Sequence, residues 1–419
     1  MKPLEQAFRD ERAAVLGTIT RRLGGDLALA EDVVQDAFVA AAVEWDRRGV
    51  PDRPGAWITT TAWRKALDRL RHDRVAAARA GDLAHEPVND DIDFDESALQ
   101  DDQLRMVFTC CHPALPPEAR MALTLRSVAG LTVPEIARAF LSSEEAMERR
   151  LTRARRKVTD AAIPFRVPPD ELLPERLAGV LRVIYVIYTE GHTATRGEVP
   201  VRGDLCEEAI RLARLLAQLM PDEAETLGLL ALLLLTDARR PARVDAAGDL
   251  VSLEHQDRSR WDARRIADGR ATLDRALKLR RSGPYVIQAA IAALHARASD
   301  FDGTDWAQIA ALYDALAAFD PSPVVAVNRA VSVGLADGPH AGLAILEAVA
   351  ADLRLARYQP LHAARAELLR RAGDGAGADA AYERAIALTT NEAQRAALQR
   401  GRSRHPPRPN GPSRITPRT

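Results

Sequence analysis

Cysteine and histidine are the first residue types to examine for chemistry in this sequence. The three cysteines are Cys110, Cys111 and Cys206, and the first two stand directly before His112. No second cluster follows at zinc-ligand spacing, and neighbouring cysteines rarely pair with each other. The sequence also shows no nucleophile–base pair and no phosphate-binding glycine loop. We therefore expect buried, reduced thiols, no metal, no cofactor and no enzyme.

A basic stretch at residues 131–158, LTVPEIARAFLSSEEAMERRLTRARRKV, carries binding chemistry instead. Thr132 with Glu135 has the spacing of a capping box, in which each side chain satisfies a backbone N–H at the start of a helix. Ser142 with Glu145 repeats that spacing ten residues later. The stretch therefore predicts two short helices joined by a tight corner.

The second of these helices is expected to be amphipathic and basic. Its apolar face consists of Met147, Leu151, Ala154 and Val158. Its remaining surface carries Arg149, Arg150, Arg153, Arg155, Arg156 and Lys157. Two capped helices with a basic second helix are typical of a helix-turn-helix, whose second helix fits the major groove of DNA. The alternative is a packed helix with a solvated basic face.

An acidic helix is expected nearer the N-terminus, from about Asp26 to Trp45. Its polar face is formed by Glu31, Asp32, Gln35 and Asp36. These residues share a face because side chains three and four positions apart stack along a helix. Such a face can dock a basic helical partner, and the alternative is a solvated charged surface.

A third helix, over residues 56–74, mixes aromatic and basic residues. It carries Trp57, Trp63, Arg64, Lys65, Arg69, Arg71 and Arg74. Aromatic rings stack on unpaired bases and cations hold phosphates, so this mixture suits single-stranded or melted nucleic acid. We expect Trp57 in the core, and for Trp63 the core and the nucleic-acid contact both stay open.

Length and composition indicate a globular protein of several domains. The chain has 419 residues, 47% of them hydrophobic and 28% charged, and a net charge of −1. Any nucleic-acid surface must therefore be a local patch. No signal peptide is evident, and the longest apolar run, residues 227–235, is too short to cross a bilayer. We expect a cytoplasmic protein that does not contact the membrane.

Gly and Pro punctuate many short Ala/Leu/Arg-rich segments, which favours an all-α fold. Residues 82–102 contain acidic residues and no Lys or Arg, as a flexible linker would. From about residue 304 the expected helices come in pairs, and residues 377–388 have the spacing of a tetratricopeptide helix. Residues 240–258 are expected to form an irregular loop, and the spacing of its residues does not identify a ligand. The expected domains are 1–75, a linker at 76–101, 102–162, a helical-repeat region at 163–400, and a disordered basic tail at 401–419.

The order of these segments resembles a bacterial sigma-70-type factor of the extracytoplasmic-function class. AEDVVQDAF, residues 30–38, resembles the helix of region 2 that binds core RNA polymerase. PGAWITTTAWRKALDRLRHDR, residues 54–74, resembles the segments that recognise and melt the −10 promoter element. LTVPEIARAF with MERRLTRARRKV resembles region 4, which reads the −35 element. Region 2 would thus occupy residues 1–75 and region 4 residues 102–162.

The resemblance implies three sets of contacts. Those expected to face the β′ clamp helices of core RNA polymerase are Glu31, Asp32, Gln35 and Asp36. Those expected along promoter DNA near −10 are Trp63, Arg64, Lys65, Arg69 and Arg71. Those expected at the −35 major groove are Glu148, Arg149, Arg150, Arg153 and Arg156. Arginine can take a guanine edge with two hydrogen bonds, and glutamate can accept from cytosine N4.

The chain continues to residue 419, well beyond region 4. In this it resembles the subgroup of sigma factors with a tetratricopeptide-like C-terminal extension, which implies that the extension controls activity without an obvious anti-sigma partner. We expect the extension to hold a sigma region or a protein partner, and whether it inhibits or activates stays open.

The expected function is therefore promoter recognition and transcription initiation together with core RNA polymerase. The alternative is a stand-alone helix-turn-helix regulator with a helical-repeat sensor domain. That alternative leaves the acidic face without a role. It predicts tight, strongly salt-dependent binding to duplex DNA without polymerase.

Overall fold

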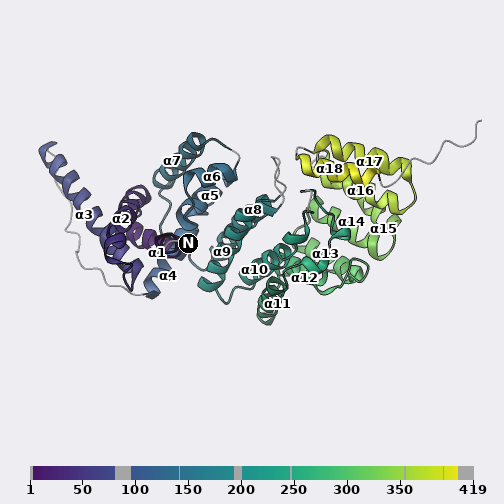
Figure 1. The fold of residues 1–419 in the computed structure, drawn as a ribbon, viewed down its shortest axis with the longest axis horizontal. Helices are drawn as coiled ribbons and strands as arrows, with labels where there is room; N and C mark the ends of the chain where they lie inside the picture. Colours follow the sequence, from purple (N-terminus) through teal and green to yellow (C-terminus); the bar gives the residue numbers. More distant parts are fainter. Residues whose placement is uncertain are drawn as a thin grey trace, which may run out of the picture. The chain divides into compact units, whose positions relative to one another are not determined.

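The computed structural model describes residues 3–80, 96–140, 142–192, 201–245, 248–352, 355–389 and 391–403. These residues form eighteen α-helices (Figure 1). Within these ranges there is no β-strand, only an isolated antiparallel bridge between Val244 and Leu250. The expected all-α class is confirmed. The chain divides into two compact units, Met1–Ile187 and Tyr188–Thr419.

Unit 1 holds the first seven helices and most of the eighth. These are α1 (Pro3–Arg22), α2 (Leu27–Arg48), α3 (Pro54–Ala80), α4 (Glu96–Cys110), α5 (Pro117–Leu123), α6 (Val133–Ala139), α7 (Glu144–Asp160) and α8 (Leu173–His192), with a π-helical turn η1 (Thr124–Val128) after α5. Helices α3 and α4 are longer than expected. The expected linker at 76–101 is therefore helical at both ends, and its middle, residues 81–95, lies outside the described residues.

Helices α1 and α4 cross closely, and this crossing holds the start of unit 1 together. A side chain at Gly17 would put its Cβ 2.7 Å from the carbonyl oxygen of Asp102, so only glycine allows this approach. The Asp102 side chain is fully buried and accepts from Arg21 Nε at 2.9 Å and from Arg105 Nη1 at 2.8 Å. Paired cations offset the cost of burying such a carboxylate.

The two capped helices at residues 131–158 are present as α6 and α7. The Thr132 backbone N–H donates to Glu135 Oε2 at 2.7 Å and the Glu135 N–H donates to Thr132 Oγ1 at 3.4 Å, which confirms the first capping box. The second cap was placed one residue too early. Ser143, not Ser142, caps α7 and accepts from the backbone N–H of Ala146, because the Ser142 N–H instead bonds Ala137 O at the end of α6.

Unit 2 contains the remaining helices. These are α9 (Gly203–Leu219), α10 (Ala224–Asp237), α11 (Ala263–Lys278), α12 (Pro284–Arg297), α13 (Trp306–Phe319), α14 (Pro323–Ala336), α15 (Pro339–Ala350), α16 (Gln359–Arg371), α17 (Gly375–Leu388) and α18 (Glu392–Ser403). Short 3-10 turns occur at η2 (Arg240–Ala242), η3 (Leu253–His255) and η4 (Arg258–Arg260). Helix α18 was not expected, and it takes the first three residues of the expected tail; residues 404–419 lie outside the described residues.

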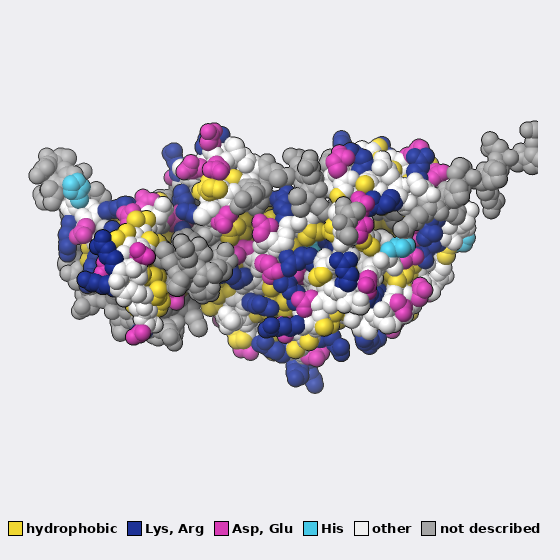
Figure 2. All heavy atoms as spheres, viewed as in Figure 1, with side chains coloured by type: hydrophobic (Ala, Val, Ile, Leu, Met, Phe, Trp, Pro, Cys, Tyr) yellow, Lys and Arg dark blue, Asp and Glu magenta, His cyan; other side chains and the backbone are white. Residues whose placement is uncertain are grey.

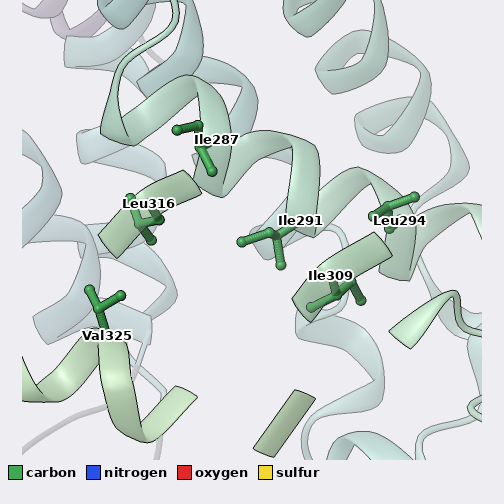
Figure 3. Close-up of a cluster of buried hydrophobic side chains, with 6 residues drawn as sticks. All are labelled: Ile287, Ile291, Leu294, Ile309, Leu316 and Val325. Atoms are coloured by element: carbon green, nitrogen blue, oxygen red, sulfur yellow. The ribbon is translucent and has the colours of Figure 1, made fainter. Parts of the chain in front are cut away.

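Helix α10 packs against α9, α11 and α12. It is apolar on every side and nearly all of it is buried, which is typical of a helix surrounded by other helices. Consecutive helices then pack in pairs, α13 with α14, α14 with α15, and α16 with α17. Figure 3 shows the cluster formed by Ile287, Ile291 and Leu294 of α12, Ile309 and Leu316 of α13, and Val325 of α14.

Candidate nucleic-acid interface

Helix α7 separates its residues into a buried stripe and an exposed basic side. Met147, Leu151, Ala154 and Val158 are buried, as the spacing predicted. An open depression runs along the exposed side and is lined by Glu145, Glu148, Arg149, Thr152 and Arg153. Three of the five residues expected at the −35 groove, Glu148, Arg149 and Arg153, thus lie together on one accessible surface.

Two other expected −35 residues already have partners in the protein. Arg150 forms an ion pair with Glu118 at 3.0 Å, and its side chain is 30% exposed. Arg156 is exposed and lies 3.4 Å from Asp160 one turn further along α7. Each arginine can exchange its carboxylate partner for a phosphate at little cost in free energy, because surface ion pairs contribute about 0–1 kcal/mol.

The opposite flank of α7 faces α2. Arg155 Nη2 lies 2.5 Å from Glu31 Oε2, and Ser127 Oγ donates to Glu31 Oε1 at 2.7 Å. Glu31 is only 5% exposed. The interpretation that Glu31 belongs to the exposed polymerase-binding face is therefore wrong in this conformation: its carboxylate joins α2 to η1 and α7.

Arg12 of α1 reinforces the same junction. It is 3% exposed and donates through Nη1 to the carbonyl oxygen of Arg126 at 3.1 Å. Burial lowers the pKa of Arg12 to about 10, while the nearby Glu31 carboxylate opposes that shift. The buried cations around Glu31 explain why this carboxylate is retained among apolar neighbours.

The rest of the acidic face of α2 is exposed. Asp32 and Gln35 are exposed and Asp36 is partly so. Arg69 of α3 spans both aspartates, with Nη2 2.8 Å from Asp36 Oδ2 and Nη1 3.4 Å from Asp32 Oδ2. The structure thus brings together a residue expected to contact −10 DNA and two residues expected to contact polymerase.

The two tryptophans of α3 differ in exposure. Trp63 is 2% exposed, with the Arg22 guanidinium 5.2 Å from its ring centroid. Its ring therefore packs in the core in this conformation, which is one of the two positions left open for it, and its contact with −10 DNA stays a prediction. Trp57, expected in the core, is half-buried and makes an edge contact with Trp45 at 5.6 Å between centroids.

Several other cations of α3 also lie at the surface. Arg64 and Arg71 are exposed and Lys65 is partly exposed. Arg71 lies 3.4 Å from Asp68, an exposed pair that is readily exchanged. Figure 2 shows acidic and basic side chains on the visible face of both units.

The cysteines lie in the interior. Cys110, Cys111 and Cys206 are all free and buried, and burial raises the pKa of the Cys111 thiol to about 11. In the described ranges, no three His, Cys, Asp or Glu side chains are grouped as they would be to hold a metal ion.

Sequence reasoning missed three residues of the α2–α7 junction: Arg12, Ser127 and Arg155. A signal was present for two members of the junction. Glu31 lies on the same helical face as Leu27, Val34 and Phe38, and Arg155 lies four residues after Leu151 and three before Val158. A charged residue on the apolar face of each helix needs a partner of opposite charge, so this pattern indicates that Glu31 and Arg155 contact each other.

The protein thus contains a helix-turn-helix, α6 and α7. Helix α2, which has an exposed acidic edge, contacts α7 through the Glu31–Arg155 pair. Residues 8–75 match the family Sigma-70 region 2, residues 105–158 match Sigma-70, region 4, and residues 176–277 match a family of unknown function, DUF6596. No solved structure matches the chain.

Relatives of the chain fall into two kinds. An uncharacterized protein of Rhizobium meliloti (strain 1021) is 44% identical over 405 residues, which is 94% of each chain. The ECF RNA polymerase sigma factor SigJ of Mycobacterium tuberculosis (strain ATCC 25618 / H37Rv) is 32% identical over 37% of this chain and 50% of SigJ. The ECF RNA polymerase sigma factor SigK of Mycolicibacterium vanbaalenii is 32% identical over 31% of this chain and 67% of SigK.

The chain belongs to the sigma-70 family. Its region 2 and region 4 domains imply a sigma factor's role in transcription initiation, with binding to core RNA polymerase and to promoter DNA. The family is not enzymatic, in agreement with the expectation from the sequence. Among the helices of the described residues, none is long and apolar enough to cross a membrane.

Proposed function

We propose that the protein is a sigma factor of the extracytoplasmic-function class whose C-terminal helical region controls its activity. The likeness to SigJ and SigK supports the class. The observation that carries the proposal is the pair of exposed helix surfaces in unit 1. The acidic edge of α2 lies in the segment that matches region 2, and the basic side of α7 lies in the segment that matches region 4.

In this proposal Asp32, Gln35 and Asp36 bind the β′ clamp helices of core RNA polymerase. Their side chains are accessible, and Arg69 is the only cation paired with them in the described part of the chain. A basic partner helix would replace Arg69 as the counter-charge.

The promoter contacts follow from the exposed cations. Arg64, Lys65, Arg69 and Arg71 of α3 hold the DNA near −10. Along α7, Glu148, Arg149 and Arg153 read base edges near −35, while Arg150 and Arg156 bind phosphates that fix the register. Arg150 and Arg156 give up exposed carboxylate partners to do so.

Association with core RNA polymerase and run-off transcription from a cognate promoter test the proposal. Asp32→Arg is expected to weaken binding to core enzyme by at least about tenfold, because it places a cation opposite basic clamp helices. Asp46→Arg, an equally exposed change further along α2, is the matched control. Tight duplex binding by a protein that ignores core polymerase would instead identify a stand-alone regulator.

The control by the C-terminal region has its own test. Consecutive helices of unit 2 pack in pairs, which supports a tetratricopeptide-like role in which stacked helices hold a sigma region or a protein partner. A chain ending after Ile187, checked for helix content by circular dichroism, is expected to give strongly altered transcript yield. Yield equal to that of the full chain would remove this part of the proposal.

A further inference from the structure

A cavity of about 260 Å³ lies within unit 2, between α10, α12 and α13. The apolar part of its wall comes from Leu232 and Leu235 of α10 and Ile291 and Ala292 of α12. Ile291 is also part of the hydrophobic cluster in Figure 3, so one side of the cavity rests on packed core. The volume corresponds to about nine water molecules, too small for a nucleotide and enough for a small organic molecule.

The polar groups of the cavity come from three helices and the turn after α10. Thr236 belongs to α10, Arg239 to the turn that follows it, Gln288 and His295 to α12, and Tyr313 to α13. Among these lining residues there is one permanent cation and no carboxylate. The cavity therefore carries a net positive charge that the wall itself does not compensate.

Arg239 differs from the arginines that follow it after α10. Arg240 pairs with Glu207 and Asp237, and Arg243 donates to the carbonyl oxygen of His192. The side chain of Arg239 has no hydrogen bond or ion pair with any described residue. Arg239 is partly exposed, and burial, with Arg258 nearby, lowers the pKa of its guanidinium. A partly buried cation without a counter-charge gains from an anion that can reach it.

His295 supplies a second unsatisfied group. Its Nδ1 atom is buried and has no hydrogen-bond partner in the described structure. Burial, with Arg239 and Arg258 nearby, lowers the pKa of His295 to about 3, so the imidazole is neutral and can either donate or accept. A ligand in the cavity would satisfy this atom together with Arg239.

The loop at residues 240–258 helps to fix this wall. Arg258 donates to the carbonyl oxygens of His295 and Ala298, at 2.6 and 2.8 Å, and to Thr304 Oγ1 at 3.0 Å. All these bonds close the C-terminal end of α12. Arg258 is therefore engaged in structure, and Arg239 is left as the cation that a ligand can reach.

We propose that this cavity binds a small organic acid, with its carboxylate on Arg239 and its apolar part against Leu232, Leu235 and Ile291. Arginine can hold a carboxylate with two parallel hydrogen bonds. A pocket lined only by apolar side chains could not make these bonds. The site lies in the unit proposed to control transcription, but its binding is independent of that proposal.

Calorimetry and thermal shift on the full-length protein test the site. The probes are hexanoate and benzoate, the neutral isosteres hexanamide and benzamide, and inorganic phosphate. At least one of the two carboxylates is expected to bind with one-to-one stoichiometry and raise the Tm. Its amide should bind at least about tenfold more weakly, because it lacks the charge that Arg239 pairs with.

Variants decide whether Arg239 is the anchor. Arg239→Gln is expected to weaken carboxylate binding at least about tenfold and to leave the Tm of the free protein equal or higher, because it removes an unpaired cation. Arg239→Lys should retain part of the affinity. Arg297→Gln, an exposed change on α12, is the matched control and should bind as the wild type does.

Four results would each overturn the proposal. They are an absence of saturable binding by both carboxylates at up to about 10 mM, equal binding of acids and amides, binding of phosphate alone, and unchanged carboxylate affinity in Arg239→Gln.

Discussion

Two neighbouring residues of α2, Glu31 and Asp32, belong to one acidic stretch but occupy opposite environments. Glu31 is buried between α2 and α7 and meets Arg155 and Ser127. Asp32 is exposed and, within the described part of the chain, pairs with Arg69 at 3.4 Å. The difference shows that one charged stretch can place one carboxylate between two segments of a unit and leave the next one at the surface.

Burial decides the energy of each contact. Removing one partner of a buried ion pair destabilises a protein by about 3–5 kcal/mol, because the other charge is left without compensation. An exposed pair contributes about 0–1 kcal/mol. The Glu31 junction should therefore behave as structure, and the Asp32 edge as a surface free to exchange partners.

The largest effect is expected from Glu31→Gln. It leaves Arg155 and the buried Arg12 facing an uncharged group, so the free energy of unfolding of unit 1 should fall by about 3–5 kcal/mol. Urea denaturation of the full chain, followed by the fluorescence of its tryptophans, measures this. Asp32→Asn is the control and should change stability by less than about 1 kcal/mol. Equal losses in the two variants would break the comparison.

The same contrast exists along α7, between Arg155 and Arg149. Arg149→Ala should weaken binding of the polymerase complex to its promoter by about 1–3 kcal/mol without lowering the Tm. Fluorescence anisotropy with labelled promoter DNA at several salt concentrations gives both the affinity and the salt slope. Arg155→Met should do the reverse, lowering stability first. A Tm loss in Arg149→Ala as large as in Arg155→Met would show that the exposed side of α7 is also structural.

Unit 2 extends the comparison to two histidines, His295 and His192, that are neutral in the folded chain and form no ion pair with a carboxylate in its described part. Burial and nearby arginines lower the pKa of His295 to about 3 and that of His192 to about 2. Above pH 6.5 both imidazoles are neutral in the folded chain and in the unfolded chain, so their protonation does not change the free energy of unfolding. Below it only the unfolded chain takes up these protons, so stability falls, by roughly 1.4 kcal/mol per histidine at pH 5.5.

Thermal unfolding between pH 7.5 and 5 follows this loss in unit 2. His295→Gln should make the pH dependence shallower, while His72→Gln, at an exposed position of α3, should leave it unchanged. A Tm for unit 2 that is level across this range would contradict the assignment of two buried neutral histidines.

The smallest effect is expected from Asp36→Asn. It breaks a 2.8 Å pair with Arg69 in which both side chains are at least 40% exposed, so stability should change by less than about 1 kcal/mol. Its effect on binding to core polymerase should exceed its effect on unfolding. A larger loss of stability than of binding would move Asp36 from the partner surface to the structural junction.

Much of this fold was predictable from local patterns. Apolar spacing located the buried stripe of α7, and cap residues located α6 and α7 to within a residue. The cap was misplaced because Ser142 and Ser143 both have suitable side chains, and only the bond from the Ser142 N–H to Ala137 O decides between them. Helix α18 was missed because its sequence is polar and it has no fully buried residue.

The candidate site was harder to predict because its partners are distant in sequence. Ser127 lies 96 residues after Glu31, so the sequence around Glu31 does not predict their hydrogen bond. Trp63 could be assigned either to stacking or to the core, and only the packing of unit 1 decides for the core. Local sequence gives a helix its faces, whereas burial of a given face depends on which distant segment covers it.

Helix α8 determines where this protein can be divided in the laboratory. Its first turns belong to unit 1, where Arg176 donates to the carbonyl oxygen of Phe108 at 3.1 Å. Its last turn belongs to unit 2, where Tyr188 stacks on His192. Shortened chains that stop just after the helix-turn-helix lose the Arg176 anchor, so any change in their behaviour mixes damage to unit 1 with the absence of unit 2. Cuts at the junction of the two units keep those effects apart.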